Sequence, residues 1–213
     1  RKIKNLLIFF FSFTNKNKLL SQSKKRLFEE EKKEYTLRCL NSICKNIRKV
    51  NNELNFNIFL KIIDDNSEKN IIHEIHKICN HSNINFEVSN LDVNKYSDQI
   101  KFKNNTRMLS HNAHIYESKK YALDSNFDLI YFVEDDYLHE EDALIEMIYT
   151  YQRISSQLND EIVLCPADYP YLYVNMEFTK NMIGFKKHWR QVNQSLCTYL
   201  ISNKTLKKYW SYY

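Results

Sequence analysis

The chain has 213 residues, of which 43% are hydrophobic, so it is long and apolar enough for one sizeable domain with a real core. Its 31 lysine and arginine residues against 26 aspartate and glutamate residues give a net charge of +5, which is mildly basic and excludes a polycation. The single glycine, Gly184, excludes a glycine-rich dinucleotide-binding loop and a Walker-type phosphate loop, because each needs more than one glycine.

The cysteine pattern and the basic residues bear on where the protein works. Five cysteines are scattered along the chain without a Cys-x-x-Cys pair, which argues against a disulfide framework and predicts a reducing, cytoplasmic compartment. The apolar run LLIFFF, residues 6–11, is too short to span a membrane. The basic residues concentrated in residues 16–49 favour either peripheral contact with anionic lipid at the inner face of a membrane or a simple solvated surface.

The first part of the chain predicts two units of a strand followed by a helix. An apolar run predicts a buried strand over residues 3–13, and apolar residues then recur at helical spacing and predict a helix over residues 33–50. The segment FNIFLKIIDDNS, residues 56–67, predicts a second strand that ends at two aspartates. Asn66 or Ser67 is placed to cap the helix that follows.

The middle of the chain predicts a short strand, a helix and a further strand-helix unit. The strand is expected over residues 84–88, and Met108, Ile115 and Ala122 fall a heptad apart, as they would on one face of a helix. The stretch FDLIYFVEDDYLHEEDALIEM, residues 127–147, then runs from an apolar strand into three carboxylates and a helix whose acidic start suits a helix N-terminus.

The last part of the chain predicts two more strands and a final helix. EIVLCP, residues 161–166, and SLCTYLIS, residues 195–202, have the apolar character of strands, and an irregular aromatic segment lies between them. The alternation of strands and helices predicts an α/β fold, a Rossmann-type sandwich with a mostly parallel central sheet flanked by helices. Ligands of such sheets bind beyond the carboxyl ends of the strands.

Two acidic clusters fall at those carboxyl ends, Asp64 with Asp65, and Glu134 with Asp135 and Asp136. Side chains alternate along an extended strand, so Glu134 and Asp136 are expected to face one way and Asp135 the other. Carboxylates this close repel one another unless a cation or the donors of a ligand lie among them. Oxygen ligands of this kind suit Mg²⁺ or Mn²⁺ bound together with a substrate diphosphate. The alternative is a solvated acidic loop that caps the next helix.

In their order and spacing, three segments resemble the motifs of nucleotide-sugar glycosyltransferases of the GT-A fold. The segments are FSFTNK, residues 11–16, IIDDNS, residues 62–67, and FVEDD, residues 132–136. The resemblance is to family 2 in particular, and FVEDD is similar to the Glu-Asp-Asp metal motif of eukaryotic N-acetylglucosaminyltransferases. It implies one GT-A-like catalytic domain over residues 1–213 that moves a sugar from a nucleoside-diphosphate donor, a UDP-sugar first of all, to a glycan or lipid-linked acceptor. The implied reaction is metal-dependent and inverting, and no nucleic-acid partner is expected.

The resemblance also implies roles in the donor site. Thr14 and its neighbours would line the nucleotide pocket, and Asp65, together with Asp64, would accept a hydrogen bond from the base. Arg107 and His111 lie on the predicted helix that precedes the acidic triplet and would contact the substrate there. For His111 a contact with the base or diphosphate and a role as a helix cap are equally compatible with the sequence.

The acidic triplet would hold the ribose, the sugar and the metal. The resemblance implies that Asp135 contacts the ribose, and that Glu134 contacts the donor sugar and joins Asp136 as a ligand of Mn²⁺ or Mg²⁺. His188 and Arg190, in the segment FKKHWR, would stack on a sugar or bind phosphate. An ordinary amphipathic hairpin fits that segment nearly as well.

The general base is the part of the family pattern that the chain does not reproduce. An inverting transferase needs a base to deprotonate the acceptor hydroxyl, and in these families it follows the penultimate strand and helix. The chain stops at Tyr213 before such a motif. Either the base lies beyond that residue, in a chain truncated at its C-terminus, or Asp168 or Glu177 replaces it, and Asp168 is our candidate.

Other classes of protein stay open at this point. A phosphoacceptor receiver domain also has acidic pairs at strand ends, but it needs an aspartate at the third strand and a lysine near the end of the fifth, and neither falls in place here. A nucleic-acid-binding α/β domain would use the basic N-terminal half, but no binding module is recognisable. A transition-metal cluster in HEIHKICNH, residues 73–81, is less favoured, because a helix would place only two of its histidines together.

Overall fold

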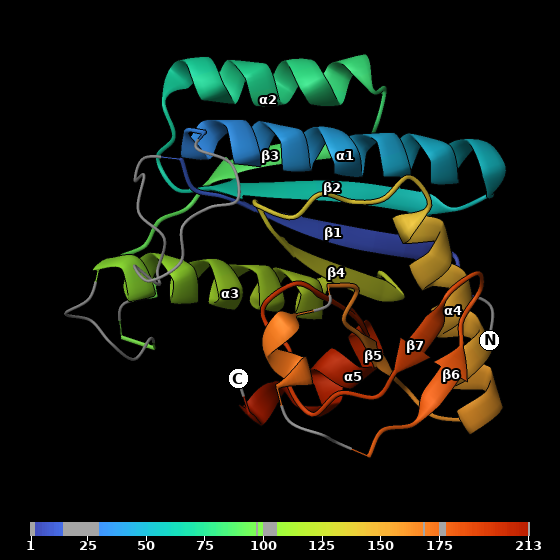
Figure 1. Ribbon diagram of the computed structural model, residues 1–213. Coiled ribbons are helices and arrows are strands. Elements are labelled where there is room, and N and C mark those ends of the chain that lie inside the picture. Colours follow the sequence, from blue (N-terminus) through green and yellow to red (C-terminus); the bar gives the residue numbers. More distant parts are fainter. Residues whose placement is uncertain are drawn as a thin grey trace.

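The centre of the protein is a mixed β-sheet (Figure 1). The computed structural model describes residues 3–14, 30–96, 98–99, 106–167, 169–174 and 178–212. In spatial order the strands of the sheet are β3 (Phe86–Asn90), β2 (Asn57–Asp64), β1 (Asn5–Ser12), β4 (Leu129–Glu134), β8 (Tyr199–Ser202) and β5 (Val163–Leu164). Parallel pairing joins the strands from β3 to β4, whereas β8 runs antiparallel to both of its neighbours.

Helices cover both faces of this sheet (Figure 1). One face is covered by α1 (Lys32–Glu53), α2 (Lys69–His81) and α4 (Ala143–Leu158), and the other by α3 (Thr106–Asp124) and α5 (Asn203–Lys208). A cluster of buried apolar side chains lies beneath each helical layer. The protein is therefore an α/β sandwich with a mostly parallel sheet between two layers of helices, as the sequence predicts.

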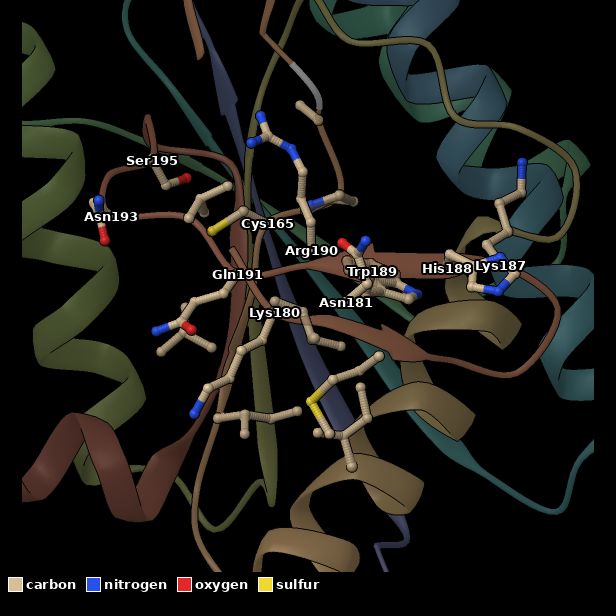
Figure 2. Close-up of a pocket in the computed structure, with 18 of the residues that line it drawn as sticks. Cys165, Lys180, Asn181, Lys187, His188, Trp189, Arg190, Gln191, Asn193 and Ser195 are labelled. Atoms are coloured by element: carbon tan, nitrogen blue, oxygen red, sulfur yellow. The ribbon is translucent and has the colours of Figure 1, made fainter. Parts of the chain in front are cut away.

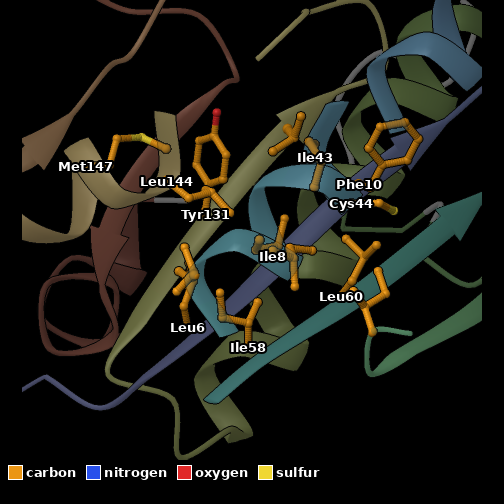
Figure 3. Packing of buried hydrophobic residues seen from close by; sticks show 14 of the residues in the cluster. Leu6, Ile8, Phe10, Ile43, Cys44, Ile58, Leu60, Tyr131, Leu144 and Met147 are labelled. Atoms are coloured by element: carbon orange, nitrogen blue, oxygen red, sulfur yellow. The ribbon is translucent and has the colours of Figure 1, made fainter. Parts of the chain in front are cut away.

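The run LLIFFF belongs to β1, in the middle of the sheet. Leu6 and Ile8 enter the cluster beneath α1, α2 and α4 (Figure 3), and Leu7 and Phe9 enter the cluster beneath α3 and α5. A strand that is buried on both faces has no polar alternation, which explains the unbroken apolar run. None of the helices in the described part of the chain combines the length and the apolar character that a membrane span requires.

A small antiparallel hairpin, β6 (Asn181–Ile183) with β7 (His188–Arg190), packs against α4. Gly184, the single glycine of the chain, begins its turn. A Cβ at this position would lie 2.4 Å from Thr150 Oγ1 and 2.5 Å from the Trp189 ring, which is closer than atoms can approach. The contact of the hairpin with α4 therefore requires glycine. The 3₁₀ turns η1 (Pro170–Tyr173) and η2 (Trp210–Tyr212) flank this part of the chain.

Several element boundaries differ from those predicted. The predicted strand over residues 84–88 lies two residues later, as β3, and the strand predicted over residues 161–166 is reduced to the two residues of β5. The cap predicted for α2 is wrong, because the helix begins at Lys69 and Glu68 occupies the cap position. Asn66 instead has a left-handed backbone, with φ of 55°, and forms part of the turn that follows β2.

Candidate active site at the carboxyl ends of the strands

The two acidic clusters lie on either side of β1, at the same edge of the sheet. Asp64 ends β2 and pairs with Ser12, and Glu134 ends β4 and pairs with Phe11. Neighbouring strands are about 4.8 Å apart, so the backbones of these two acidic residues are about 10 Å apart. Strands β1, β2 and β3 follow one another to one side, whereas β4 lies on the other side of β1. Open α/β sheets bind ligands at such a reversal of strand order.

Asp64 joins the loops that follow β1 and β2. Its Oδ1 accepts a hydrogen bond from Ser12 Oγ at 2.7 Å, and its Oδ2 accepts one from the Ser67 amide at 2.8 Å. Thr14 Oγ1 in turn donates to Ser67 Oγ at 2.7 Å. Thr14 and Asp64, both predicted to bind substrate, therefore lie close together, and Asp64 is buried with both of its oxygens in contacts within the protein.

Asp65 connects the end of β2 with α3. Ser110 Oγ donates to Asp65 Oδ2, and Asn66 Nδ2 donates to Oδ1 at 2.9 Å. One turn further along α3, the ring nitrogens of the buried His114 each lie 3.1 Å from a backbone carbonyl oxygen, one in α3 and one in β2. Asp65, which is 8% exposed, therefore helps to fix the part of α3 that carries His111.

Asp135 is held by α1, on the face of the sheet opposite α3. Lys32 Nζ forms an ion pair with Asp135 Oδ1. Oδ2 accepts hydrogen bonds from Thr36 Oγ1 at 2.7 Å and from the Phe13 amide at 3.1 Å. Asp135 is 6% exposed and Lys32 is 7% exposed, so this is a buried pair with additional hydrogen bonds. It fixes the start of α1 and the loop after β1 to the end of β4.

Glu134 faces α3, where it forms a close group with His111 and Cys197. One ligand atom from each of these side chains lies within 4.8 Å of the other two. Burial raises the pKa of Glu134 to about 7, and the negative charges of Asp136 and Asp135 add to this effect. Burial also lowers the pKa of His111, which disfavours the imidazolium form. Burial therefore favours the neutral forms of both Glu134 and His111.

Asp136 is the most exposed member of the acidic triplet, with 37% of its side chain exposed. Its Oδ2 lies 3.8 Å from Lys32 Nζ, and its charge contributes to the raised pKa of Glu134. Because β4 ends at Glu134 and the chain then turns, Asp136 does not follow the alternation of an extended strand. Glu134 and Asp136 are the carboxylates whose mutual repulsion a cation would relieve most.

A pocket of about 940 Å³ lies near this acidic end. Figure 2 shows side chains that line it. Its walls come from α4, the segment around β5 and the hairpin, and His188 and Arg190, both predicted to bind substrate, line it. The Arg190 guanidinium lies 4.3 Å from the centre of the Tyr173 ring. Tyr169, also in the wall, lies with its hydroxyl 3.0 Å from that of Tyr137, which directly follows the acidic triplet. The pocket and the triplet are therefore neighbours.

Some predicted site residues cannot be placed. Asp168 and Glu177, the candidates for the general base, lie outside the described residues, as do residues 16–29 of the basic segment. Arg107 belongs to α3, but its side chain is outside the described part of the structure. The roles assigned to these residues stay predictions.

The histidines and the cysteine of HEIHKICNH, residues 73–81, do not converge. Cys79 is buried in the core, with its sulfur 3.9 Å from that of Cys44, whereas His73 and His76 are exposed on α2. This segment is an amphipathic helix with one face in the core.

Three residues that organise the site were not singled out in the sequence. Lys32 and Thr36, in the first turns of α1, hold Asp135, and Cys197 joins the group around Glu134. A lysine and a threonine four residues apart at the start of a helix are common, so they carry no local signal. Cys197 stood out only as one of the scattered cysteines.

The raised pKa of Glu134 predicts a pH-dependent stability. The folded protein keeps the Glu134 proton to about pH 7, whereas the ordinary value is 4.5. The stability contributed by the protonated carboxyl is therefore complete below pH 4.5 and is lost as the pH rises to about 7. Glu134→Gln, which mimics the protonated form, should exceed the wild-type free energy of unfolding by about 2 kcal/mol at pH 8, after allowance for its partial exposure.

Urea denaturation at pH 4.5 and pH 8, with a metal chelator present, measures this difference. Near pH 4.5 the variant and the wild type should be nearly equal in stability. Glu74→Gln, on α2, is the matched control and should have the same small effect at both pH values. A stability difference for Glu134→Gln that does not change with pH would contradict the assignment.

Comparisons with known proteins do not identify a function for this site. A scan against protein-family models and a search of curated proteins gave no match. The two acidic clusters meet at the reversal of strand order, and a pocket with aromatic and basic walls lies near them. Such an arrangement suits a ligand that carries both phosphate and polar ring groups.

Proposed function

We propose that the protein is a glycosyltransferase that moves a sugar from a nucleoside-diphosphate donor, a UDP-sugar first of all, to a glycan or lipid-linked acceptor. The observation that carries the proposal is the position of Glu134 and Asp136. Glu134 ends a central strand where the strand order reverses, Asp136 lies in the turn that follows, and a pocket of about 940 Å³ lies nearby. The segments that resemble GT-A motifs support the same function, because Thr14, Asp64 and the acidic triplet gather at one edge of the sheet.

A divalent ion fits the charge of this site. Burial and the negative charges of Asp136 and Asp135 raise the pKa of Glu134 to about 7, and a cation between Glu134 and Asp136 would favour the ionised form of Glu134. Mn²⁺ or Mg²⁺ would be held by Asp136 with Glu134 as a second ligand. When bound, such an ion neutralises negative charge that develops on a diphosphate leaving group.

Asp64, Asp65 and Asp135 act in this proposal first as positioning residues. Each accepts hydrogen bonds from protein donors at both of its oxygens. A carboxylate has about four acceptor sites, so contact of Asp65 with a base and of Asp135 with a ribose stays compatible with these bonds. The contacts of Arg107 and His111 with the donor also stay predictions.

The pocket beside the triplet offers a place for the acceptor. Tyr173 and Trp189 present aromatic rings, on whose faces the apolar side of a sugar can stack. Arg190 and His188 add donors suited to hydroxyl or phosphate oxygens. A glycan or a lipid-linked sugar phosphate matches this combination. Asp168, two residues beyond the pocket-lining Pro166, is kept as the predicted base.

The other classes of protein are supported less well. Receiver domains have the parallel order 2-1-3-4-5, which differs from the order found here. A nucleic acid would bring phosphates toward an edge of the sheet that is already negatively charged. Both classes of protein therefore fit the site less well than a glycosyltransferase does.

Calorimetric titration with UDP and a panel of other nucleoside diphosphates, in the presence of Mn²⁺, tests the proposal. We expect binding that depends on Mn²⁺ and that Asp136→Ala weakens on the order of 30-fold, or about 2 kcal/mol, because the ion loses its main ligand. Glu74→Ala also removes one carboxylate, on α2 and away from the sheet edge, and should leave binding unchanged.

Other outcomes would point elsewhere. Binding that needs no metal and that Asp136→Ala does not affect would contradict the metal role. Failure to bind any nucleoside diphosphate would contradict the proposed donor. Binding of RNA with a steep dependence on salt would support the nucleic-acid alternative.

A further inference from the structure

Three side chains that could ligate a soft metal ion meet between α3, β4 and the segment before β8. His111 comes from α3, Glu134 ends β4, and Cys197 lies two residues before β8. One ligand atom from each lies within 4.8 Å of the other two, and Cys197 Sγ lies 3.6 Å from His111 Nε2. All three side chains are half-buried, so the group is accessible to an ion and partly shielded from water.

We propose that His111, Glu134 and Cys197 form a binding site for Zn²⁺ or a similar thiophilic divalent ion. Imidazole nitrogen, carboxylate oxygen and thiolate sulfur are the protein ligands that Zn²⁺ takes. With Zn–S and Zn–N bonds of about 2.3 and 2.05 Å, tetrahedral coordination places sulfur and nitrogen about 3.6 Å apart. The sulfur and nitrogen of Cys197 and His111 already have this separation. A fourth position is left for water or a substrate atom.

The surrounding charges favour a cation in this group. Burial raises the pKa of Cys197 to about 11, and the negative charge of Glu134 adds to this effect. The negative charges of Asp136 and Asp135 act on Glu134, and the positive charge of Lys119 acts on Cys197. The Lys119 ammonium acts against a cation at this site.

The structure around the group holds the ligands in place. The Glu134 amide donates to Thr198 Oγ1 at 3.2 Å, which fixes the segment that carries Cys197 against the end of β4. His111 follows Ser110, whose hydroxyl donates to Asp65. Ligands fixed in this way lose little freedom when they bind an ion, which favours tight binding.

This site goes beyond the proposed function and does not depend on it. Zn²⁺ favours sulfur and nitrogen ligands, whereas the Mn²⁺ or Mg²⁺ proposed at Asp136 favours oxygen. The two proposals share Glu134, but Asp136 belongs only to the first and Cys197 only to the second. Variants of these two residues therefore test them separately.

Titration of the reduced, metal-free protein with Co²⁺, a spectroscopic substitute for Zn²⁺, tests the site. We expect one equivalent of Co²⁺ to produce cobalt–thiolate absorption in the near ultraviolet and the visible bands of a tetrahedral ion, and Zn²⁺ to displace it. Cys197→Ser should remove the thiolate band and weaken Zn²⁺ binding on the order of 100-fold. Cys165→Ser, at a cysteine that is also half-buried, is the matched control and should retain both.

Two further variants complete the test. His111→Ala should weaken Zn²⁺ binding by a similar factor, whereas Asp136→Ala should keep the cobalt spectrum of the wild type even where it loses nucleotide binding. Circular dichroism checks that each variant is folded. A thiolate band that persists in Cys197→Ser, or folded wild-type protein that shows no such band, would overturn the site whatever the outcome with UDP.

Discussion

Replacement of Asp135 by alanine is expected to lower the free energy of unfolding by about 3–5 kcal/mol. The Lys32 ammonium is buried, and the variant removes its ion-pair partner. The Phe13 amide loses this acceptor in the same step, and the Thr36 hydroxyl keeps only its longer contact with the Lys32 carbonyl oxygen, at 3.2 Å. Asp136 lies 3.8 Å from Lys32 but is more than a third exposed, so it compensates only in part. Urea denaturation at pH 7, followed by circular dichroism, measures the loss.

Two variants separate this mechanism from general damage at the end of β4. Asp136→Ala removes the neighbouring, more exposed carboxylate and should change stability by less than about 1 kcal/mol. Lys32→Met added to Asp135→Ala should recover most of the loss, because the double variant no longer buries an unpaired charge. Equal losses for Asp135→Ala and Asp136→Ala would show that the buried pair does not stabilise the fold.

These adjacent aspartates therefore have different expected roles. Asp135→Ala should act mainly on stability, whereas Asp136→Ala should act mainly on binding of metal and nucleotide. Alternation along a strand predicts that Glu134 and Asp135 point to opposite faces, and their contacts with α3 and α1 agree with that prediction. The alternation does not predict on which face of the sheet a buried lysine, Lys32, pairs with an aspartate.

The fold could be predicted from hydrophobic periodicity where elements are long and buried. The central strand β1 and the helix α1 were predicted within a few residues, because one is apolar throughout and the other has a clear apolar stripe. The direction of β8 could not be predicted, since an apolar strand has the same composition whether it runs parallel or antiparallel. The hairpin was expected only as an alternative for FKKHWR, residues 185–190, because its strands are short and half-exposed and show no clear period.

The site could be predicted only as a location. Acidic residues that end buried strands had to meet at one sheet edge, and Asp64 and Glu134 do so. Their partners lie far away in sequence: Lys32 is 103 residues from Asp135, and Ser110 is 45 residues from Asp65. Contacts over such distances leave no local pattern, so the sequence cannot tell which carboxylates are engaged by the protein and which favour a cation.

Glu146→Ala is expected to weaken the contact of the hairpin with α4. The free energy needed to detach the hairpin should fall by about 3 kcal/mol. Glu146, on α4, is 4% exposed. Its Oε2 accepts from the Lys186 amide at 2.6 Å, and its Oε1 accepts from the Phe185 amide at 3.1 Å and from Trp189 Nε1 at 3.0 Å. Thr150 Oγ1 donates to the same Oε1 at 2.8 Å. The variant leaves these donors without their shared acceptor.

Hydrogen exchange of the hairpin amides measures the release directly, and exchange should be faster on the order of 100-fold. Glu140→Ala is the matched control, because the exposed Glu140 also contacts this turn, through an ion pair with Lys187. Its removal should leave exchange almost unchanged. The pocket depends on the same contact, since the hairpin supplies the wall that contains Arg190.

The contribution of Glu146 should also depend on pH. Burial alone would raise its pKa, but the hydrogen bonds from Trp189, the turn amides and Thr150 outweigh burial and lower it below the ordinary value of 4.5. The carboxylate therefore stabilises the hairpin fully above pH 4.5, and this stabilisation is lost as the pH falls through the lowered pKa. The difference between Glu146→Ala and the wild type should accordingly be largest near pH 7 and should shrink in acid. A difference that grows as the pH falls would mean that the protonated form, and not the carboxylate, holds the turn.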